Sequence, residues 1–195
     1  MDKLNQVLQS YLTTPETDYS IMISGAWGCG KTYYINDKFE KLARETDVPG
    51  SGAKGKKCEK YIPAYISLYG VSSVVDFEYK VFCGINTWAG KQLVRVASRI
   101  GSIYAERSGF SVGKNDLKDW TVIKKNRILV FDDLERICED KLPLKEVLGL
   151  INSYTEHSHL KVIVICNEDY YMSKEADPAL KEAYVKYKEK SIRYT

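Results

Sequence analysis

The stretch Gly25-Ala-Trp-Gly-Cys-Gly-Lys-Thr32 decides the fold of this chain. Gly25, Gly30, Lys31 and Thr32 occupy the fixed positions of the G-x-x-x-x-G-K-[ST] pattern, which cradles phosphate groups. Its glycines let the backbone curl, so that successive N–H groups point at phosphate oxygens. The pattern predicts that Lys31 contacts the β- and γ-phosphates and that the Thr32 hydroxyl binds Mg²⁺.

The residues around this motif provide the strand, loop and helix that a phosphate-binding loop requires. Tyr19–Ser24 is a short apolar run typical of a strand, and Lys31–Arg44 has apolar residues at helical spacing. The N-terminal partial charge of that helix would favour a phosphate. The alternative is a glycine-rich turn without a ligand, but a bare turn does not require Lys-Thr at its end. We therefore expect the nucleotide to contact the whole loop and the residue after it, namely Gly25, Ala26, Trp27, Gly28, Cys29, Gly30, Lys31, Thr32 and Tyr33.

Composition constrains the class of protein more than its partners. The chain has 195 residues, of which 44% are hydrophobic, which is enough for one ordinary domain with a real core over 1–195, or for one domain and a part. The formal net charge of +3 is small and indicates no particular class of partner. The five cysteines form no C-x-x-C pair and their number is odd, which predicts free thiols in a reducing, cytoplasmic compartment. The polar N-terminus is no signal peptide, and no uncharged apolar run has membrane-spanning length, so we expect no membrane partner.

The stretch Arg127-Ile-Leu-Val-Phe-Asp-Asp-Leu-Glu-Arg136 is the second strong motif. Its apolar residues predict a buried strand that ends at Asp132, and ligands of open α/β sheets bind at the carboxyl ends of strands. We expect Asp132 to hold Mg²⁺ through a water, and Asp133 to orient the attacking water. Glu135 is the competing candidate for that base. Arg136 is either paired with a local carboxylate or offered to a neighbouring subunit as an arginine finger.

Leu160–Cys166 predicts a further buried strand with Asn167 at its carboxyl end. There Asn167 would hydrogen-bond the γ-phosphate or the attacking water, and the alternative is a turn residue in Asn-Glu-Asp.

The remaining segments carry weaker signals. Residues 1–18 predict a leading helix and connector. Tyr11 of that helix and Tyr19, directly after the connector, either contact adenine or pack in the core. Residues 70–126 predict a largely helical insertion. Within it Lys91, Arg95 and Arg99 recur every fourth residue, which makes nucleic acid a conceivable partner with a solvated helix face as the alternative.

Together, the three motifs resemble those of the KAP-type P-loop NTPases, which belong to the additional-strand-catalytic-glutamate group near the STAND and AAA+ ATPases. The family-like details are Trp27 before a glycine and the Asp-Asp-Leu-acid-Arg run, and the resemblance covers Ser20–Thr195. It implies ATP and Mg²⁺ as cofactors. By the same resemblance, Lys31 and Thr32 bind nucleotide and metal, Asp132 serves the metal, Asp133 takes the place of the catalytic acid and Asn167 lies on the sensor strand.

The resemblance also implies a three-layer P-loop NTPase fold, with a parallel sheet of order 5-1-4-3-2 and helices on both faces. The Tyr61–Leu68 strand would lie at an edge, which agrees with Pro63 near its start. Glu135 departs from the family, which often has Asp there, and no membrane helices separate the two main motifs. The last residues, Ser191-Ile-Arg-Tyr-Thr195, look like the opening of one more strand. We nevertheless expect the C-terminal strand of the family and the helical lid to be missing, so that the chain is the N-terminal part of a longer protein or a fragment.

Three functional hypotheses follow. The first is a Mg²⁺-dependent ATPase that powers or gates a larger assembly. The second is a nucleotide-dependent oligomerisation switch with little turnover, of the kind that bacterial relatives use in defence against phage; a homo-oligomer or a C-terminal effector region would then be the partner. The third is a nucleic-acid-stimulated ATPase. The preference for ATP rests on the resemblance, since the sequence has no guanine-reading Asn-Lys-x-Asp.

Overall fold

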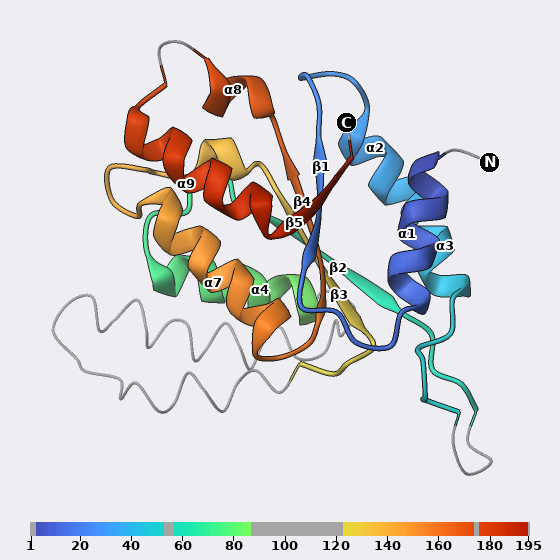
Figure 1. The fold of residues 1–195 in the computed structure, drawn as a ribbon. Helices are drawn as coiled ribbons and strands as arrows, with labels where there is room; N and C mark the ends of the chain where they lie inside the picture. Colours follow the sequence, from blue (N-terminus) through green and yellow to red (C-terminus); the bar gives the residue numbers. More distant parts are fainter. Residues whose placement is uncertain (1–2, 53–56, 87–122, 174–175, 195) are drawn as a thin grey trace, which may run out of the picture.

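A parallel β-sheet with helices on both faces forms the centre of the molecule (Figure 1), in a computed structural model that describes residues 3–52, 57–86, 123–173 and 176–194. The strands are β1 Ser20–Ser24, β2 Ile62–Ser67, β3 Arg127–Asp132, β4 Lys161–Cys166 and β5 Ser191–Tyr194. They lie in the order β2-β3-β4-β1-β5, and every neighbouring pair is parallel. The predicted order 5-1-4-3-2 and the edge position of the strand that carries Pro63 are thereby confirmed.

The expectation that the C-terminal strand is missing is wrong. β5 pairs with β1 from Ser191, opposite Ser20, to Tyr194, opposite Ile23. The preceding helix α9, Pro178–Glu189, returns the chain to the amino end of the sheet. Only one residue then separates the end of this helix from the start of β5. A strand of four residues is stable there because the free edge of β1 supplies its hydrogen-bonding partners.

Helices cover both faces of the sheet (Figure 1). On one face lie α1, Lys3–Thr13, and a continuous helical segment made of α2 Lys31–Tyr34, a π-helical turn Ile35–Phe39 and α3 Glu40–Glu45. On the other face lie α4 Val74–Asn86, α7 Leu144–Glu156 and α9. A short helix that the sequence did not predict, α8 Glu168–Met172, follows β4. None of the helices in the described ranges is long and apolar enough to cross a membrane.

The helical insertion predicted over 70–126 is described only in part. α4 agrees with it, whereas residues 87–122, with Lys91, Arg95 and Arg99, lie outside the described residues. The five cysteines are free thiols, as predicted.

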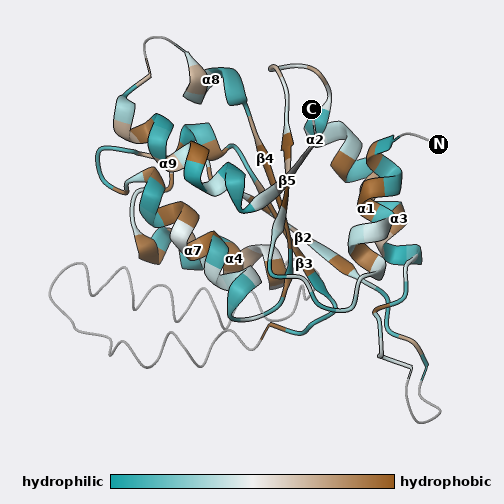
Figure 2. Ribbon diagram, in the orientation of Figure 1, coloured by the Kyte–Doolittle hydropathy of each residue, from teal (hydrophilic) through white to brown (hydrophobic). Residues whose placement is uncertain are grey.

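Alternate residues of β1, β3 and β4 belong to two apolar cores, one on each face of the sheet. Figure 2 shows hydrophobic segments along these strands. In β1, Ile21 and Ile23 pack with α1 and the Lys31–Glu45 helical segment, whereas Met22 packs with residues of α4, α7 and α9. All three side chains are almost fully buried. This alternation matters for the site, because it fixes which face each residue at a strand end points to.

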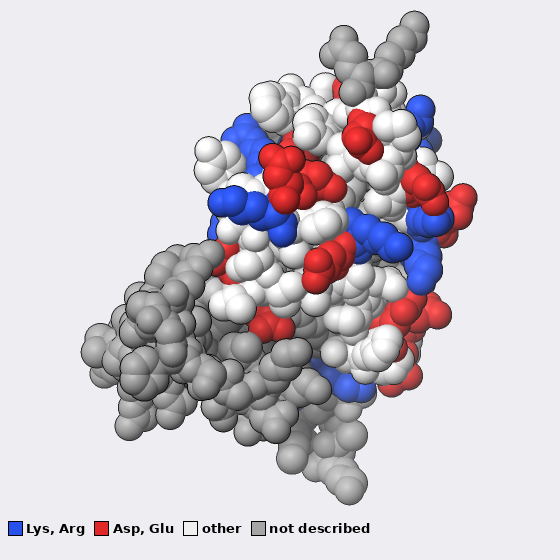
Figure 3. Space-filling view, turned by 90° about the vertical axis from the view of Figure 1, so that its left-hand side faces the viewer, with Lys and Arg blue, Asp and Glu red and all other residues white. Residues whose placement is uncertain are grey.

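Charges are mixed on the face to which α7 and α9 contribute (Figure 3). Lys186 pairs with Glu182 at 2.5 Å, and Lys190 pairs with Glu156 at 3.1 Å. Among the described residues visible in this view, neither sign forms a continuous patch, which agrees with the small net charge.

The amino end of β4 is fixed by two buried polar side chains, Tyr11 and Lys161. The Tyr11 hydroxyl accepts the N–H of Val162 at 2.8 Å and the residue is buried, so Tyr11 packs in the core, one of the two roles that the sequence left open. Lys161 is 3% exposed and donates from Nζ to the Thr14 carbonyl oxygen at 2.7 Å and to Thr17 Oγ1 at 3.2 Å. Burial lowers the pKa of Lys161 from 10.5 to about 8.

This lowered pKa predicts a stability that rises with pH. Between the folded pKa of about 8 and the unfolded value of 10.5, the unfolded chain binds more protons at Lys161, so alkaline pH favours the folded state through this group. From pH 7 to pH 10 we expect the unfolding free energy to rise by about 1–2 kcal/mol relative to Lys161→Met, measured by denaturant titration. Lys145 is exposed, and the unfolding free energy of Lys145→Met should change with pH as it does in the unmodified chain. The same pH dependence in all three proteins would contradict the prediction.

Candidate functional site

The loop between β1 and α2 has the backbone that a phosphate cradle needs. Gly28 and Gly30 have φ of 78° and 92°, in the left-handed region that L side chains rarely adopt. A Cβ at Gly25 would lie 3.0 Å from Cys29 Sγ, so this glycine leaves room for the cysteine side chain inside the curl. Tyr34 N donates to Gly30 O at 2.8 Å, which begins the helix directly after the loop.

Lys31 lies across the same loop. Its Nζ donates to the carbonyl oxygens of Gly25 at 2.6 Å and of Ala26 at 2.9 Å. Trp27 and Tyr33, by contrast, are 63% and 73% exposed. The loop therefore presents an ammonium group within its curl and two accessible aromatic rings beside it.

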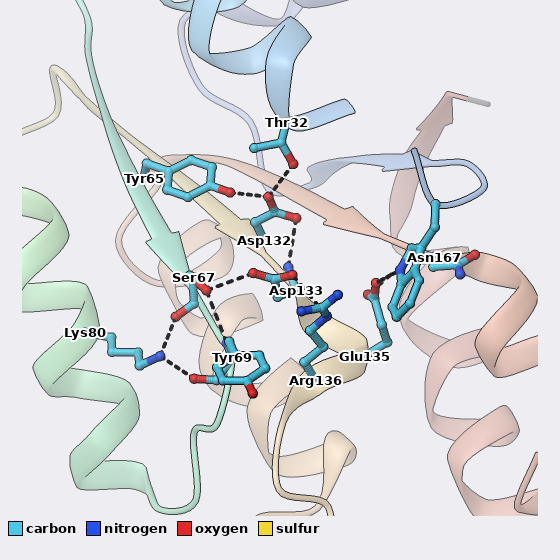
Figure 4. A network of polar contacts seen from close by, with 11 residues as sticks. Thr32, Tyr65, Ser67, Tyr69, Lys80, Asp132, Asp133, Glu135, Arg136 and Asn167 are labelled. Atoms are coloured by element: carbon cyan, nitrogen blue, oxygen red, sulfur yellow. Dashed lines mark hydrogen bonds and ion pairs between the residues drawn. The ribbon is translucent and has the colours of Figure 1, made fainter. Parts of the chain in front are cut away.

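The two sequence motifs meet through a hydrogen bond between Thr32 and Asp132 (Figure 4). Strand alternation places Asp132 on the face of β3 that Ile128 and Val130 share, which is the face covered by α2. Thr32 Oγ1 donates to Asp132 Oδ2 at 2.8 Å, although the two residues are 100 positions apart. Tyr65 of β2 donates its hydroxyl proton to the same carboxylate oxygen.

Asp133 follows in a left-handed conformation, with φ 60° and ψ 36°, which turns the chain out of the strand. Its N–H donates to Asp132 Oδ1 at 2.8 Å, and its own carboxylate accepts the Ser67 hydroxyl at 2.8 Å (Figure 4). Arg136 Nε lies 3.5 Å from Asp133 Oδ1. The two adjacent aspartates thus point to different partners, Asp132 to the loop helix and Asp133 to the end of β2.

Lys80 of α4 supports the end of β2 from the opposite side. It donates from Nζ to the carbonyl oxygens of Ser67, at 2.9 Å, and of Tyr69. Burial lowers the pKa of Lys80, and the nearby carboxylates of Asp133 and Asp76 partly oppose this effect. The ammonium therefore fixes the backbone next to Asp133 and adds positive charge near it.

Glu135 connects the phosphate loop to the end of β4 (Figure 4). Trp27 Nε1 donates to Glu135 Oε1 at 3.0 Å, and the backbone N–H of Asn167 donates to Oε2 at 3.2 Å. Asn167 itself caps α8, since its side-chain oxygen accepts the N–H of Asp169. This is the turn role that the sequence analysis gave as the alternative for Asn167, and the side-chain amide nitrogen takes no part in this cap.

Arg136 is held within its own chain. Its guanidinium lies 4.7 Å from the ring centroid of Trp27 and 5.6 Å from that of Tyr69, in addition to its ion pair with Asp133. Cation–π contacts of this kind are worth about 0.5–1 kcal/mol at exposed sites. Of the two roles weighed for Arg136, these contacts favour pairing with a local carboxylate.

The structure thus brings residues of the three predicted motifs together at the carboxyl edge of the sheet (Figure 4). One set of hydrogen bonds joins Thr32 to the two aspartates and β2, and a second joins Trp27, Glu135 and Asn167. Arg136 contacts both sets, through its ion pair with Asp133 and its cation–π contact with Trp27. The sequence interpretation missed Tyr65, Ser67 and Lys80. A signal existed for the first two: the implied order places β2 beside β3, so the carboxyl ends of both strands had to meet. Lys80 reaches the site through helix packing, which no sequence pattern specified.

Comparisons with known proteins address the family and the fold. A model of the KAP family P-loop domain matches residues 1–110, which is more than half of the chain and includes the phosphate loop but not the β3 motif. No curated protein sequence matches the chain.

Among solved structures, the crystal structure of Cdc6p from Pyrobaculum aerophilum is similar, with 15% sequence identity and a TM-score of 0.50. The alignment covers 98% of this chain and 43% of that one, so this chain spans less than half of the neighbour's length. A protein described as an ATPase matches with 15% identity and a TM-score of 0.38, over 88% of this chain and 63% of that one. The Cdc6p likeness supports a P-loop type of α/β fold.

Proposed function

Because the chain belongs to the KAP family of P-loop domains, we propose that it binds ATP together with Mg²⁺ and hydrolyses the γ-phosphate. The observation that carries this proposal is the 2.8 Å hydrogen bond from Thr32 to Asp132. It joins the end of the phosphate loop to Asp132 at the end of β3, and a hydroxyl and a carboxylate side by side are oxygen ligands of the kind that Mg²⁺ prefers.

The residues present fit both cofactors. Mg²⁺ prefers oxygen ligands and usually keeps several waters, which suits a hydroxyl and a carboxylate that share one edge of the sheet. The loop fits a triphosphate, since the left-handed glycines Gly28 and Gly30 expose backbone and Lys31 supplies a point charge. In this proposal Thr32 and Asp132 hold the metal, Asp132 through a water. When bound, Mg²⁺ would neutralise charge on the β- and γ-phosphate oxygens.

The remaining residues have the following proposed roles. Lys31 contacts the terminal phosphates and stabilises the charge that develops on them. Asp133 orients the attacking water and accepts its proton, with Glu135 as the competing base. Asn167 donates from its side-chain amide to the γ-phosphate or to that water, and Arg136 holds Asp133 and Trp27 in place.

We expect ATP to bind more tightly with Mg²⁺ than with EDTA, and inorganic phosphate to be released only with Mg²⁺. Calorimetric titration would measure binding, and a phosphate assay under the same conditions would measure turnover. GTP serves as the comparison nucleotide, because the preference for ATP rests on the family resemblance. Binding without phosphate release would overturn hydrolysis and retain nucleotide binding. Absence of binding with either nucleotide would overturn the whole proposal.

A further inference from the structure

The carboxylate of Asp132 accepts three hydrogen bonds, one of which comes from a residue outside both sequence motifs. Thr32 Oγ1 and the Tyr65 hydroxyl donate to Oδ2, and the Asp133 N–H donates to Oδ1 (Figure 4). Asp132 is 7% exposed. An ionised carboxylate has about four lone-pair sites, so these donors leave room for about one more contact.

The fold places the Tyr65 hydroxyl there. Tyr65 lies opposite Val130 in the parallel pairing of β2 and β3, two positions before the pair Ser67–Asp132. Strand alternation puts its side chain on the face of β2 away from Ala64 and Ile66, which pack in the α4 and α7 core. The ring therefore lies on the α2 side of the sheet and reaches Asp132 along the strand direction.

The backbone of Tyr65 is fixed by close packing of α4. A Cβ at Gly84 would lie 2.7 Å from Ile66 Cγ1 and 3.0 Å from the Tyr65 carbonyl oxygen, so only glycine lets the helix approach this near. β3 on one side and α4 against it thus fix the backbone of Tyr65. The residue is 36% exposed, and the hydrogen bond to Asp132 is the contact that holds the ring at the carboxylate.

We propose that Tyr65 is a positioning residue for the metal. It holds Asp132 Oδ2, so that the lone pair that remains on Oδ1 points at a water of Mg²⁺ beside Thr32. This inference rests on the proposed ATP and Mg²⁺ binding. Because the hydroxyl acts on the carboxylate and not on the phosphates, its removal should weaken only the part of nucleotide affinity that depends on the metal.

The test is the ratio of ATP dissociation constants measured with EDTA and with Mg²⁺, for the unmodified chain and for Tyr65→Phe. The phenylalanine keeps the ring and removes one hydrogen bond to a charged group. We therefore expect the ratio to fall about tenfold, while the ATP dissociation constant measured with EDTA stays unchanged. Tyr170→Phe removes an exposed hydroxyl on α8 and should leave the ratio as it is.

The outcomes separate this inference from the proposed function. An unmodified chain whose ATP affinity does not respond to Mg²⁺ would overturn the proposed metal site itself. A normal response of the unmodified chain together with an unchanged ratio for Tyr65→Phe would overturn the role of Tyr65 alone. Equal weakening with Mg²⁺ and with EDTA would also overturn it, because it would indicate a merely structural effect. Thermal melting in EDTA identifies that case independently.

Discussion

Replacing Lys31 with alanine is expected to lower ATP affinity by at least about 100-fold, because the variant loses charge-assisted hydrogen bonds to the β- and γ-phosphates that contribute about 1.5–3 kcal/mol each. In the structure its Nζ already lies within the loop, bonded to the carbonyl oxygens of Gly25 and Ala26. The binding constant would be measured by calorimetric titration with ATP and Mg²⁺, and phosphate release should fall with it.

A matched control is available on the same helical segment. Lys41 is 71% exposed at its side chain and pairs with Asp37 one turn away, so Lys41→Ala changes the net charge equally without altering the loop. We expect this variant to bind ATP as the unmodified chain does. If Lys31→Ala retained full affinity while melting normally, the loop would not be the nucleotide site.

The fold was predictable because its evidence lies within short segments of the chain. The glycine, lysine and threonine pattern at Gly25–Thr32 fixed the order of strand, loop and helix, and the apolar run before Asp132 fixed a second strand. The family resemblance then supplied the order of the sheet. β5 was expected to be missing because four residues, Ser191–Tyr194, are too few to show the alternation of side chains that is typical of a strand. Its stability comes from pairing with β1.

The site was predictable only as a set of residue types. Which acceptor each donor reaches depends on strand register and on chain segments that lie far apart in sequence. Tyr65 and Asp132 are 67 positions apart, and Trp27 and Glu135 are 108 apart. The role of Arg136 was open for the same reason, because the guanidinium contacts Trp27 of the loop through tertiary packing.

The choice between Asp133 and Glu135 as the base also depends on such contacts. Each Glu135 carboxylate oxygen accepts one N–H group, from Trp27 and from Asn167, so this side chain already links the loop to β4. Asp133 follows the metal-side carboxylate directly and is held by a single short hydrogen bond, from Ser67, with Arg136 more distant at 3.5 Å. Among the contacts of the described residues, Asp133 Oδ1 accepts no short side-chain hydrogen bond, whereas each oxygen of Glu135 accepts an N–H group, so Asp133 is better placed to accept a proton from a water within hydrogen-bond reach.

We therefore expect Asp133→Asn to lower the turnover number about 100-fold to 10,000-fold while ATP affinity stays within about twofold, the pattern of a lost general base. Glu135→Gln retains an acceptor for one of the two N–H groups, and we expect a smaller fall in turnover accompanied by weaker binding, because the loop loses part of its support. Steady-state phosphate release and calorimetric titration of the two variants, with Glu146→Gln on the exposed face of α7 as control, separate these effects. A larger loss of turnover in Glu135→Gln at unchanged affinity would assign the base to Glu135, and Asp133 would then serve to hold Ser67 and Arg136 at the end of β2.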